Sequence, residues 1–88
     1  MHVEKEYPFY ITAEEGRTTG SMDFVAWDDT DVIIIDFKTD HASISEIHTR
    51  YHAQLNAYRK AANIIWPDHK IRVYAWSFHN SKEIEIHP

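Results

Sequence analysis

The sequence predicts an α/β fold in which one long helix packs on a mixed β-sheet. Apolar runs rich in β-branched and aromatic residues, separated by turn-forming residues, are typical of strands. Apolar residues that recur every three or four positions between residues 44 and 65 predict a helix. That helix is long enough to be a crossover connection between two strands of one sheet. The five expected strands lie near residues 3–12, 18–27, 32–38, 70–79 and 82–87.

The first two strands are expected to form a hairpin that turns at residues 14–17. In the expected register Pro8 lies opposite Asp23, and Glu6 lies opposite Val25. Glu6 would then lie on the same face as Asp23 and diagonal to it, because directly opposed residues share a face of the sheet.

The second hairpin brings two aspartates face to face. Its turn spans residues 28–31, which are rich in aspartate, a residue that hydrogen-bonds readily to its own backbone in turns. A register with Trp27 opposite Val32 also places Asp23 opposite Asp36. Two opposed carboxylates about 5 Å apart repel each other and destabilise the sheet. A divalent cation between them would remove that repulsion.

Lys38 completes this candidate site, because it lies two residues after Asp36 and therefore on the same face. The apolar run 32–35 predicts a strand buried on both faces, which makes ionised carboxylates there more costly. The alternative is that Asp23 is an ordinary acid at a strand end and that Asp36 and Lys38 form an ordinary surface ion pair. Because all three side chains share one face, we favour a functional site.

The helix carries a polar residue beside its apolar stripe. Ser43 and Glu46 form a possible capping box at its start, and Pro67 ends it. Gln54 lies at the edge of the stripe, where it is either a residue of the helix flank or part of a polar site under the helix. The stripe itself consists of Ile44, Ile47, Tyr51, Leu55, Tyr58, Ala62 and Ile65.

Three segments together resemble the PD-(D/E)xK nuclease superfamily, and within it the RecB-like nuclease domains of exonuclease V and AddA-type helicase–nucleases. They are similar to that family's G-x-x-D, D-[YF]-K-T and Q-x-x-x-Y motifs, in the same order and with the same spacing. The resemblance covers residues 4–76 and implies a restriction-endonuclease-like core. The matching segments are Gly20-Ser-Met-Asp23, Ile34-Ile-Asp36-Phe-Lys38-Thr39 and Tyr51-His-Ala-Gln54-Leu-Asn-Ala-Tyr58.

The resemblance implies a role for each residue of the site. Asp23, Asp36 and the backbone carbonyl of Phe37 would bind Mg²⁺ or Mn²⁺, cations that take a few oxygen ligands and keep several waters. The metal would lower the pKa of a bound water and stabilise charge in the transition state. Lys38 would orient or help to deprotonate that water and offset the developing negative charge.

Two helical residues would complete the site by the same resemblance. Gln54 and Tyr58 would contact the DNA backbone or the metal-bound waters. RecB-like domains usually begin with a helix that supplies a histidine ligand, and this chain begins at about the strand after it. Glu6 is a candidate supplementary acid, although an ordinary polar strand residue is the simpler interpretation.

The expected function follows from this resemblance. Residues 1–88 would form a single RecB-like nuclease domain, a segment of a longer DNA-repair and recombination helicase–nuclease. It would hydrolyse DNA as a Mg²⁺-dependent exonuclease, with DNA and a helicase region as its partners. The alternative is a non-catalytic module that keeps the nuclease fold to bind DNA or protein.

Composition sets further limits on this interpretation. The 88 residues have a net charge of −5, so much of any DNA affinity is expected from outside this chain. The absence of cysteine suits the reducing cytoplasm, and no segment predicts a membrane span. Both glycines, Gly16 and Gly20, are expected at turns, and the histidine pair His48 and His52 is expected at the surface. The basic residues along a possible DNA path are Arg50, Arg59, Lys60, Lys70 and Arg72, with solvation of the helix surface the simpler explanation for Arg59 and Lys60.

Overall fold

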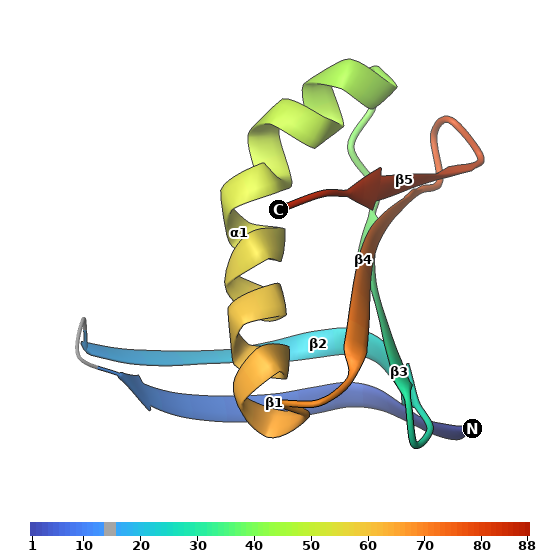
Figure 1. Ribbon diagram of the computed structural model, residues 1–88. Helices are drawn as coiled ribbons and strands as arrows, with labels where there is room; N and C mark the ends of the chain where they lie inside the picture. Colours follow the sequence, from blue (N-terminus) through green and yellow to red (C-terminus); the bar gives the residue numbers. More distant parts are fainter. Residues whose placement is uncertain (14–15) are drawn as a thin grey trace.

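The computed structural model describes residues 1–13 and 16–88, and within these ranges it contains five strands and one helix (Figure 1). The α/β class is therefore confirmed, and the observed bounds lie within two residues of the predicted ones. The elements are β1 (His2–Ala13), β2 (Gly16–Trp27), β3 (Asp31–Lys38), α1 (Ile44–Ile65), β4 (Lys70–Ser77) and β5 (Lys82–Ile86).

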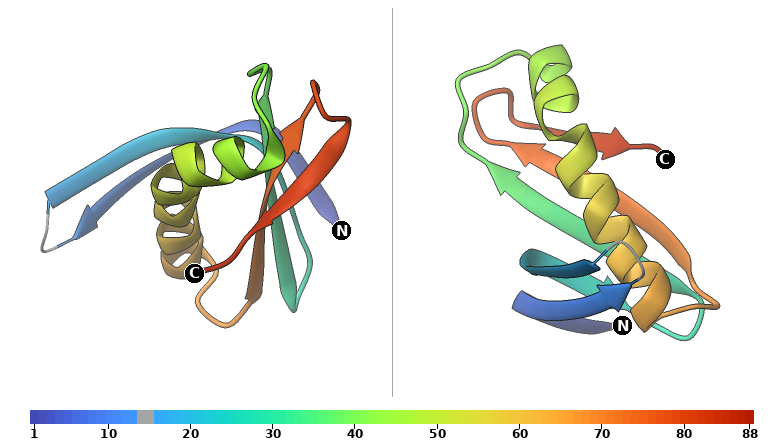
Figure 2. Two further views of the ribbon diagram at one scale, coloured as in Figure 1. Left: turned by 90° about the horizontal axis from the view of Figure 1, so that it is seen from above. Right: turned by 90° about the vertical axis from the view of Figure 1, so that its left-hand side faces the viewer.

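The strands form one mixed sheet in the order β1-β2-β3-β4-β5. Strands β3 and β4 are parallel, and every other neighbouring pair is antiparallel. Helix α1 makes the crossover between β3 and β4 and lies on one face of the sheet (Figure 2). The β1–β2 hairpin extends beyond α1 at one side of the molecule (Figure 1). The described residues include no helix that is long and apolar enough to cross a membrane.

Helix α1 begins and ends where the sequence predicts. The Ser43 side chain accepts a hydrogen bond from the Glu46 N–H, and the Glu46 side chain accepts one from the Ser43 N–H, so the capping box is confirmed. Ile47 and Leu55 are fully buried against the sheet. The prediction was wrong at Ile44, which is 37% exposed because it lies in the first turn, at the edge of the packed face.

The expected burial of β3 on both faces was wrong. Val32 and Ile34 point toward α1 and have no exposed surface. On the other face Ile33 and Ile35 are only partly buried, and Phe37 is 45% exposed. The reason is that, within the described residues, α1 covers only one face of the sheet.

The register of the β1–β2 hairpin also differs from the prediction. Pro8 pairs with Ser21, and Glu4 rather than Glu6 lies opposite Val25. The strands continue to Ala13 and Gly16, which pair with each other, so the connection is shorter than expected and the register shifts by two residues. The predicted turn residues Glu14 and Glu15 lie outside the described residues. Glu6 lies level with Asp23 at a break in the ladder and has a φ of 52°.

Gly20 is not in a turn but inside β2, opposite Phe9. A Cβ atom at this position would lie 2.7 Å from Cζ of the Phe9 ring. The ring is 93% buried and packs edge-on against Tyr58, with ring centroids 5.6 Å apart. The first position of the G-x-x-D motif therefore provides space for an aromatic ring that contacts the helix.

We expect Gly20→Ala to destabilise the fold by about 1–3 kcal/mol, the usual cost of forcing extra volume into a packed core. The free energy of unfolding from urea denaturation measures this loss. Thr19→Ala, at the exposed neighbouring position of β2, is the matched control. Equal stability of the two variants would show that the Phe9 ring can move aside at no cost.

Candidate active site

The two predicted aspartates meet where the β2–β3 ladder ends. The observed pairs run from Trp27–Val32 to Phe24–Ile35, which is the predicted register, and the next step brings Asp23 level with Asp36. There the Asp23 side chain replaces the backbone as acceptor, because its Oδ2 accepts a hydrogen bond of 2.9 Å from the Phe37 N–H.

A change of alternation in β2 accompanies this arrangement. Met22 and Val25 are both fully buried in the core although they are three residues apart, so the side-chain alternation shifts between them. The shift lies beside Glu6, whose positive φ is uncommon for a non-glycine residue. Such irregularities of strands bend the chain and re-aim side chains. Both irregularities lie at the break in the β1–β2 ladder where Asp23 is level with Glu6.

Asp36 and Lys38 form a nearly buried ion pair. Lys38 Nζ lies 2.7 Å from Asp36 Oδ2, and the two side chains are 12% and 7% exposed. Burial raises the pKa of Asp36 above its ordinary value, the Lys38 ammonium opposes that rise, and the neighbouring Asp23 carboxyl adds to it. Two carboxylates against one ammonium leave an excess negative charge at a partly buried position.

The helix brings Gln54 and Tyr58 to the same place. Lys38 Nζ donates a hydrogen bond of 3.0 Å to Gln54 Oε1, and Gln54 Nε2 lies 3.5 Å from the Tyr58 hydroxyl. Burial raises the pKa of Tyr58, and the charges of Asp36 and Asp23 raise it further. The structure thus gathers all five predicted side chains on the helix-covered face of the sheet.

The donor set fits a hard divalent cation that keeps most of its waters. Two carboxylates side by side, with an excess negative charge, are the protein ligands that Mg²⁺ commonly takes. Within residues 1–13 and 16–88 no group of three or more histidine, aspartate or glutamate side chains could hold a metal, so Glu6 does not join the pair. The Phe37 side chain points to the opposite, partly exposed face, and the role of its carbonyl stays a prediction.

Sequence reasoning missed two polar contacts next to this site. The Tyr51 ring lies under the Lys38 ammonium, with Nζ 3.7 Å from the ring centroid. The Tyr51 hydroxyl donates a 2.7 Å hydrogen bond to Asp40 Oδ2. That bond first, and the Arg50 guanidinium second, lower the pKa of Asp40. A signal was present, since Tyr51 precedes Gln54 by three residues and so lies on the same helix face.

Arg59 was wrongly assigned to solvation of the helix surface. Its guanidinium donates to the backbone carbonyls of Ile71, at 2.9 Å, and Ile86, and so ties α1 to β4 and β5. His48 and His52 lie side by side with ring centroids 5.4 Å apart, and no third ligand joins them among the described residues.

The fold and the gathered side chains define a class of protein: an α/β domain with paired acids and a lysine at the end of a strand hairpin. The sequence matches the PD-(D/E)XK nuclease superfamily over residues 1–86. The chain therefore belongs to this superfamily, as the three motifs predicted.

Two relatives make the comparison more specific, and both are named as subunits of an ATP-dependent helicase/nuclease. The protein from Anoxybacillus flavithermus is 35% identical over 85 residues, which cover 86% of this chain. The protein from Syntrophomonas wolfei is 30% identical over 84 residues, which cover 91% of the chain. In both cases the matched region is 7% of the relative's length.

Proposed function

We propose that this chain is the nuclease segment of a longer helicase–nuclease and hydrolyses phosphodiester bonds of DNA with Mg²⁺ or Mn²⁺. The observation that carries the proposal is the meeting of Asp23, Asp36 and Lys38 on one covered face. A scaffold has no reason to keep a nearly buried acid beside a second acid, because this arrangement costs stability. The names of the two relatives support the assignment to a helicase–nuclease.

In this proposal Asp23, Asp36 and the Phe37 carbonyl hold the metal. When bound, the cation lowers the pKa of a water and stabilises charge on the transferring phosphoryl group. Lys38 orients that water and offsets the negative charge that develops on the phosphate oxygens. Gln54 accepts from the Lys38 ammonium and so limits the directions in which the amine can point.

The substrate is proposed to be DNA that enters along the helix side of the sheet. The net charge of −5 means that this chain alone offers few phosphate contacts, so most of the affinity comes from the rest of the longer polypeptide. We infer an exonuclease that acts in DNA repair or recombination in the cytoplasm.

One observation favours a second candidate function, a module that binds protein. The face opposite α1 carries a groove, and among the described residues that line it one, Glu83, is charged. Its remaining lining is apolar or aromatic, and contiguous exposed apolar surface marks interaction sites. The groove does not contain the acid pair, so both functions can coexist. Its other lining residues are Ile33, Ile35, Phe37, Tyr74, Trp76 and Phe78.

Cleavage of end-labelled linear DNA by the full polypeptide that carries this chain tests the proposal. We expect cleavage with Mg²⁺ or Mn²⁺ and none with chelator, and we expect Asp36→Ala to lower the rate at least a hundredfold. Asp29→Ala, which removes an exposed acid of the β2–β3 turn, is the matched control. Closed circular DNA should resist an exonuclease. Full activity of Asp36→Ala would refute the mechanism, and DNA binding without cleavage would favour the second candidate.

A further inference from the structure

The Lys38 ammonium is held from three directions. Two of its partners, Asp36 and Gln54, are defined positions of the D-[YF]-K-T and Q-x-x-x-Y motifs, and the third, Tyr51, lies three residues before Gln54. Asp36 and Gln54 contact it through oxygen atoms at 2.7 and 3.0 Å. The third partner is the face of the Tyr51 ring, with the ring centroid 3.7 Å from Nζ. An ammonium at this distance from an aromatic face is attracted by the ring's electrons, and the attraction grows when the site is desolvated.

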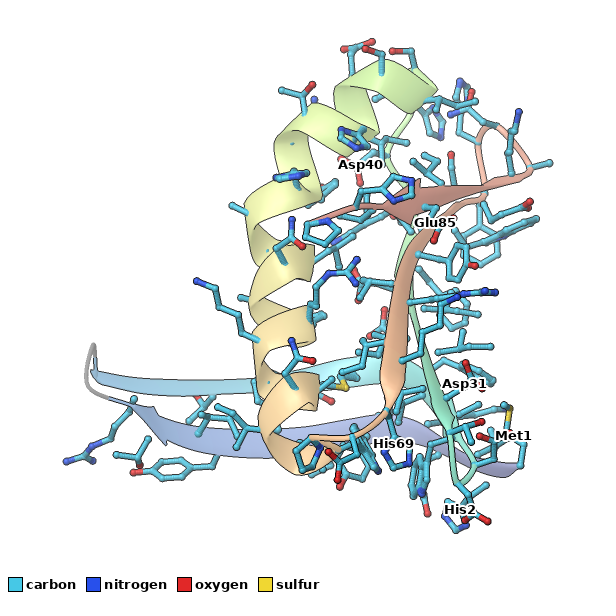
Figure 3. All side chains as sticks on the ribbon, in the orientation of Figure 1. Met1, His2, Asp31, Asp40, His69 and Glu85 are labelled. Carbon is cyan, nitrogen blue, oxygen red and sulfur yellow. The ribbon has the colours of Figure 1, made fainter. Side chains whose placement is uncertain are left out.

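The Tyr51 ring is itself anchored at its far end. Its hydroxyl donates to Asp40 Oδ2 at 2.7 Å, and the Arg50 guanidinium donates to the same oxygen at 2.6 Å. Asp40 follows β3 by two residues, so the bond joins the end of that strand to the first half of α1. Figure 3 labels Asp40 beside this part of the helix. The Tyr51 ring packs against the hydrophobic core, whereas its hydroxyl bonds to Asp40, which is not part of that core.

A lysine needs such support because its amine stands on a flexible four-carbon stem. Packing alone would accept any apolar side chain of similar size at position 51. The ring-to-ammonium contact requires an aromatic ring, and only tyrosine combines that ring with a hydroxyl that can donate to the Asp40 carboxylate. The two contacts link Asp40, in the segment after β3, through Tyr51 to Lys38 in the candidate site.

We propose that Tyr51 and Asp40 form a positioning pair that holds the Lys38 ammonium in its cleavage-ready place. Neither residue touches substrate or metal; each acts through Lys38. The consequence for catalysis rests on the proposed nuclease function, whereas the consequence for the position of Lys38 does not.

Four variants separate this role from packing. We expect Tyr51→Leu and Asp40→Ala each to lower kcat for DNA cleavage about ten- to a hundredfold, as misplacement of a reacting group does, with KM changed less than twofold. Asp40→Asn keeps an oxygen that accepts from the tyrosine and should restore kcat to near the wild-type value. Tyr51→Phe keeps the ring but loses the hydroxyl that bonds to Asp40. Its kcat should lie between that of Tyr51→Leu and that of the wild type. Tyr10→Leu removes an aromatic ring that is 60% exposed on β1 and serves as the control.

Proton NMR of the 88-residue chain supplies a readout independent of activity. The Tyr51 ring current should move the Lys38 ε-methylene resonance upfield, and Lys38→Arg assigns that resonance. We expect the shift to persist in Asp40→Asn and to disappear in Tyr51→Leu. Asp40→Ala should reduce it, because the ring loses its anchor.

The outcomes distinguish the position of Lys38 from its role in catalysis. An unchanged Lys38 resonance and unchanged kcat in folded Asp40→Ala would overturn the positioning role. So would variants that lose thermal stability but keep the wild-type kcat per folded molecule. If the resonance responds as expected while the wild-type polypeptide cleaves no DNA, the positioning pair is confirmed and the proposed nuclease function is wrong.

Discussion

Lys38→Ala is expected to lower the rate of DNA cleavage by about a hundred- to a thousandfold while Mn²⁺ still binds. The amine in our proposal acts on water and phosphate and is not a metal ligand, so its removal takes away one positive partner of the developing charge. Loss of a neighbouring positive charge should leave the affinity for the cation the same or higher. Cleavage kinetics and calorimetric titration with Mn²⁺ measure the two effects separately.

The folding consequence of this substitution has to be controlled. Lys38→Ala leaves the 93% buried Asp36 side chain without its ammonium, and breaking a buried pair from one side costs about 3–5 kcal/mol. Kinetics are therefore measured with saturating Mn²⁺, which replaces the missing charge. Lys70→Ala removes an exposed lysine at the other end of the β3–β4 pair and is the matched control. Full nuclease activity of folded Lys38→Ala would eliminate the mechanism.

The β2–β3 register could be predicted because two local constraints agree. A short turn rich in aspartate limits the possible pairings, and a slip of one residue would move Val32 and Ile34 out of the core. The same reasoning could not find the β1–β2 register. The connecting residues 14–17 fit turns of more than one length, and a slip of two residues keeps every side chain on its own face.

Contacts that depend on how α1 lies on the sheet could not be predicted from the sequence either. From the sequence alone, Arg59 is predicted to be an exposed helical residue. In the structure α1 packs near β4 and β5, and the Arg59 guanidinium donates hydrogen bonds to one backbone carbonyl of each region. Tyr51 fits the apolar stripe whether or not its hydroxyl makes a hydrogen bond. Periodicity predicts the helix face on which a residue lies, but not the polar atoms that its side chain contacts. The periodicity predicted Gln54 at the edge of the apolar stripe, and the structure shows that its side chain accepts a hydrogen bond from Lys38.

The uncovered face of β3 shows how a correct pattern can lead to a wrong conclusion. The apolar run 32–35 is typical of strands in parallel pairs, which are usually covered on both faces. The described chain supplies one covering helix, so Ile33 and Ile35 line an open groove instead. The sequence pattern indicates only that both faces of β3 are apolar. Burying the face of Ile33 and Ile35 would require a contact other than the one with α1.

A divalent cation is expected to raise the melting temperature of the 88-residue chain, and Asp36→Asn is expected to remove that response. A ligand that binds only the folded state stabilises it, by about 1.4 kcal/mol at a concentration ten times its Kd. For a domain of this size that energy corresponds to about 5–10 °C. Differential scanning calorimetry with millimolar Mg²⁺, Mn²⁺ and chelator measures the shift.

The same substitution should leave the metal-free chain at least as stable as the wild type at neutral pH. Burial raises the pKa of Asp36 in the folded state, so its contribution to stability is full below the unfolded pKa and is lost as the pH rises through the folded pKa. Asparagine carries no charge to lose, and Lys38 keeps Gln54 and the Tyr51 ring as partners. Asp29→Asn, in the exposed turn, should respond to Mn²⁺ as the wild type does. A wild-type melting curve indifferent to both cations, or an Asp36→Asn variant that still responds, would rule out a metal site at the acid pair.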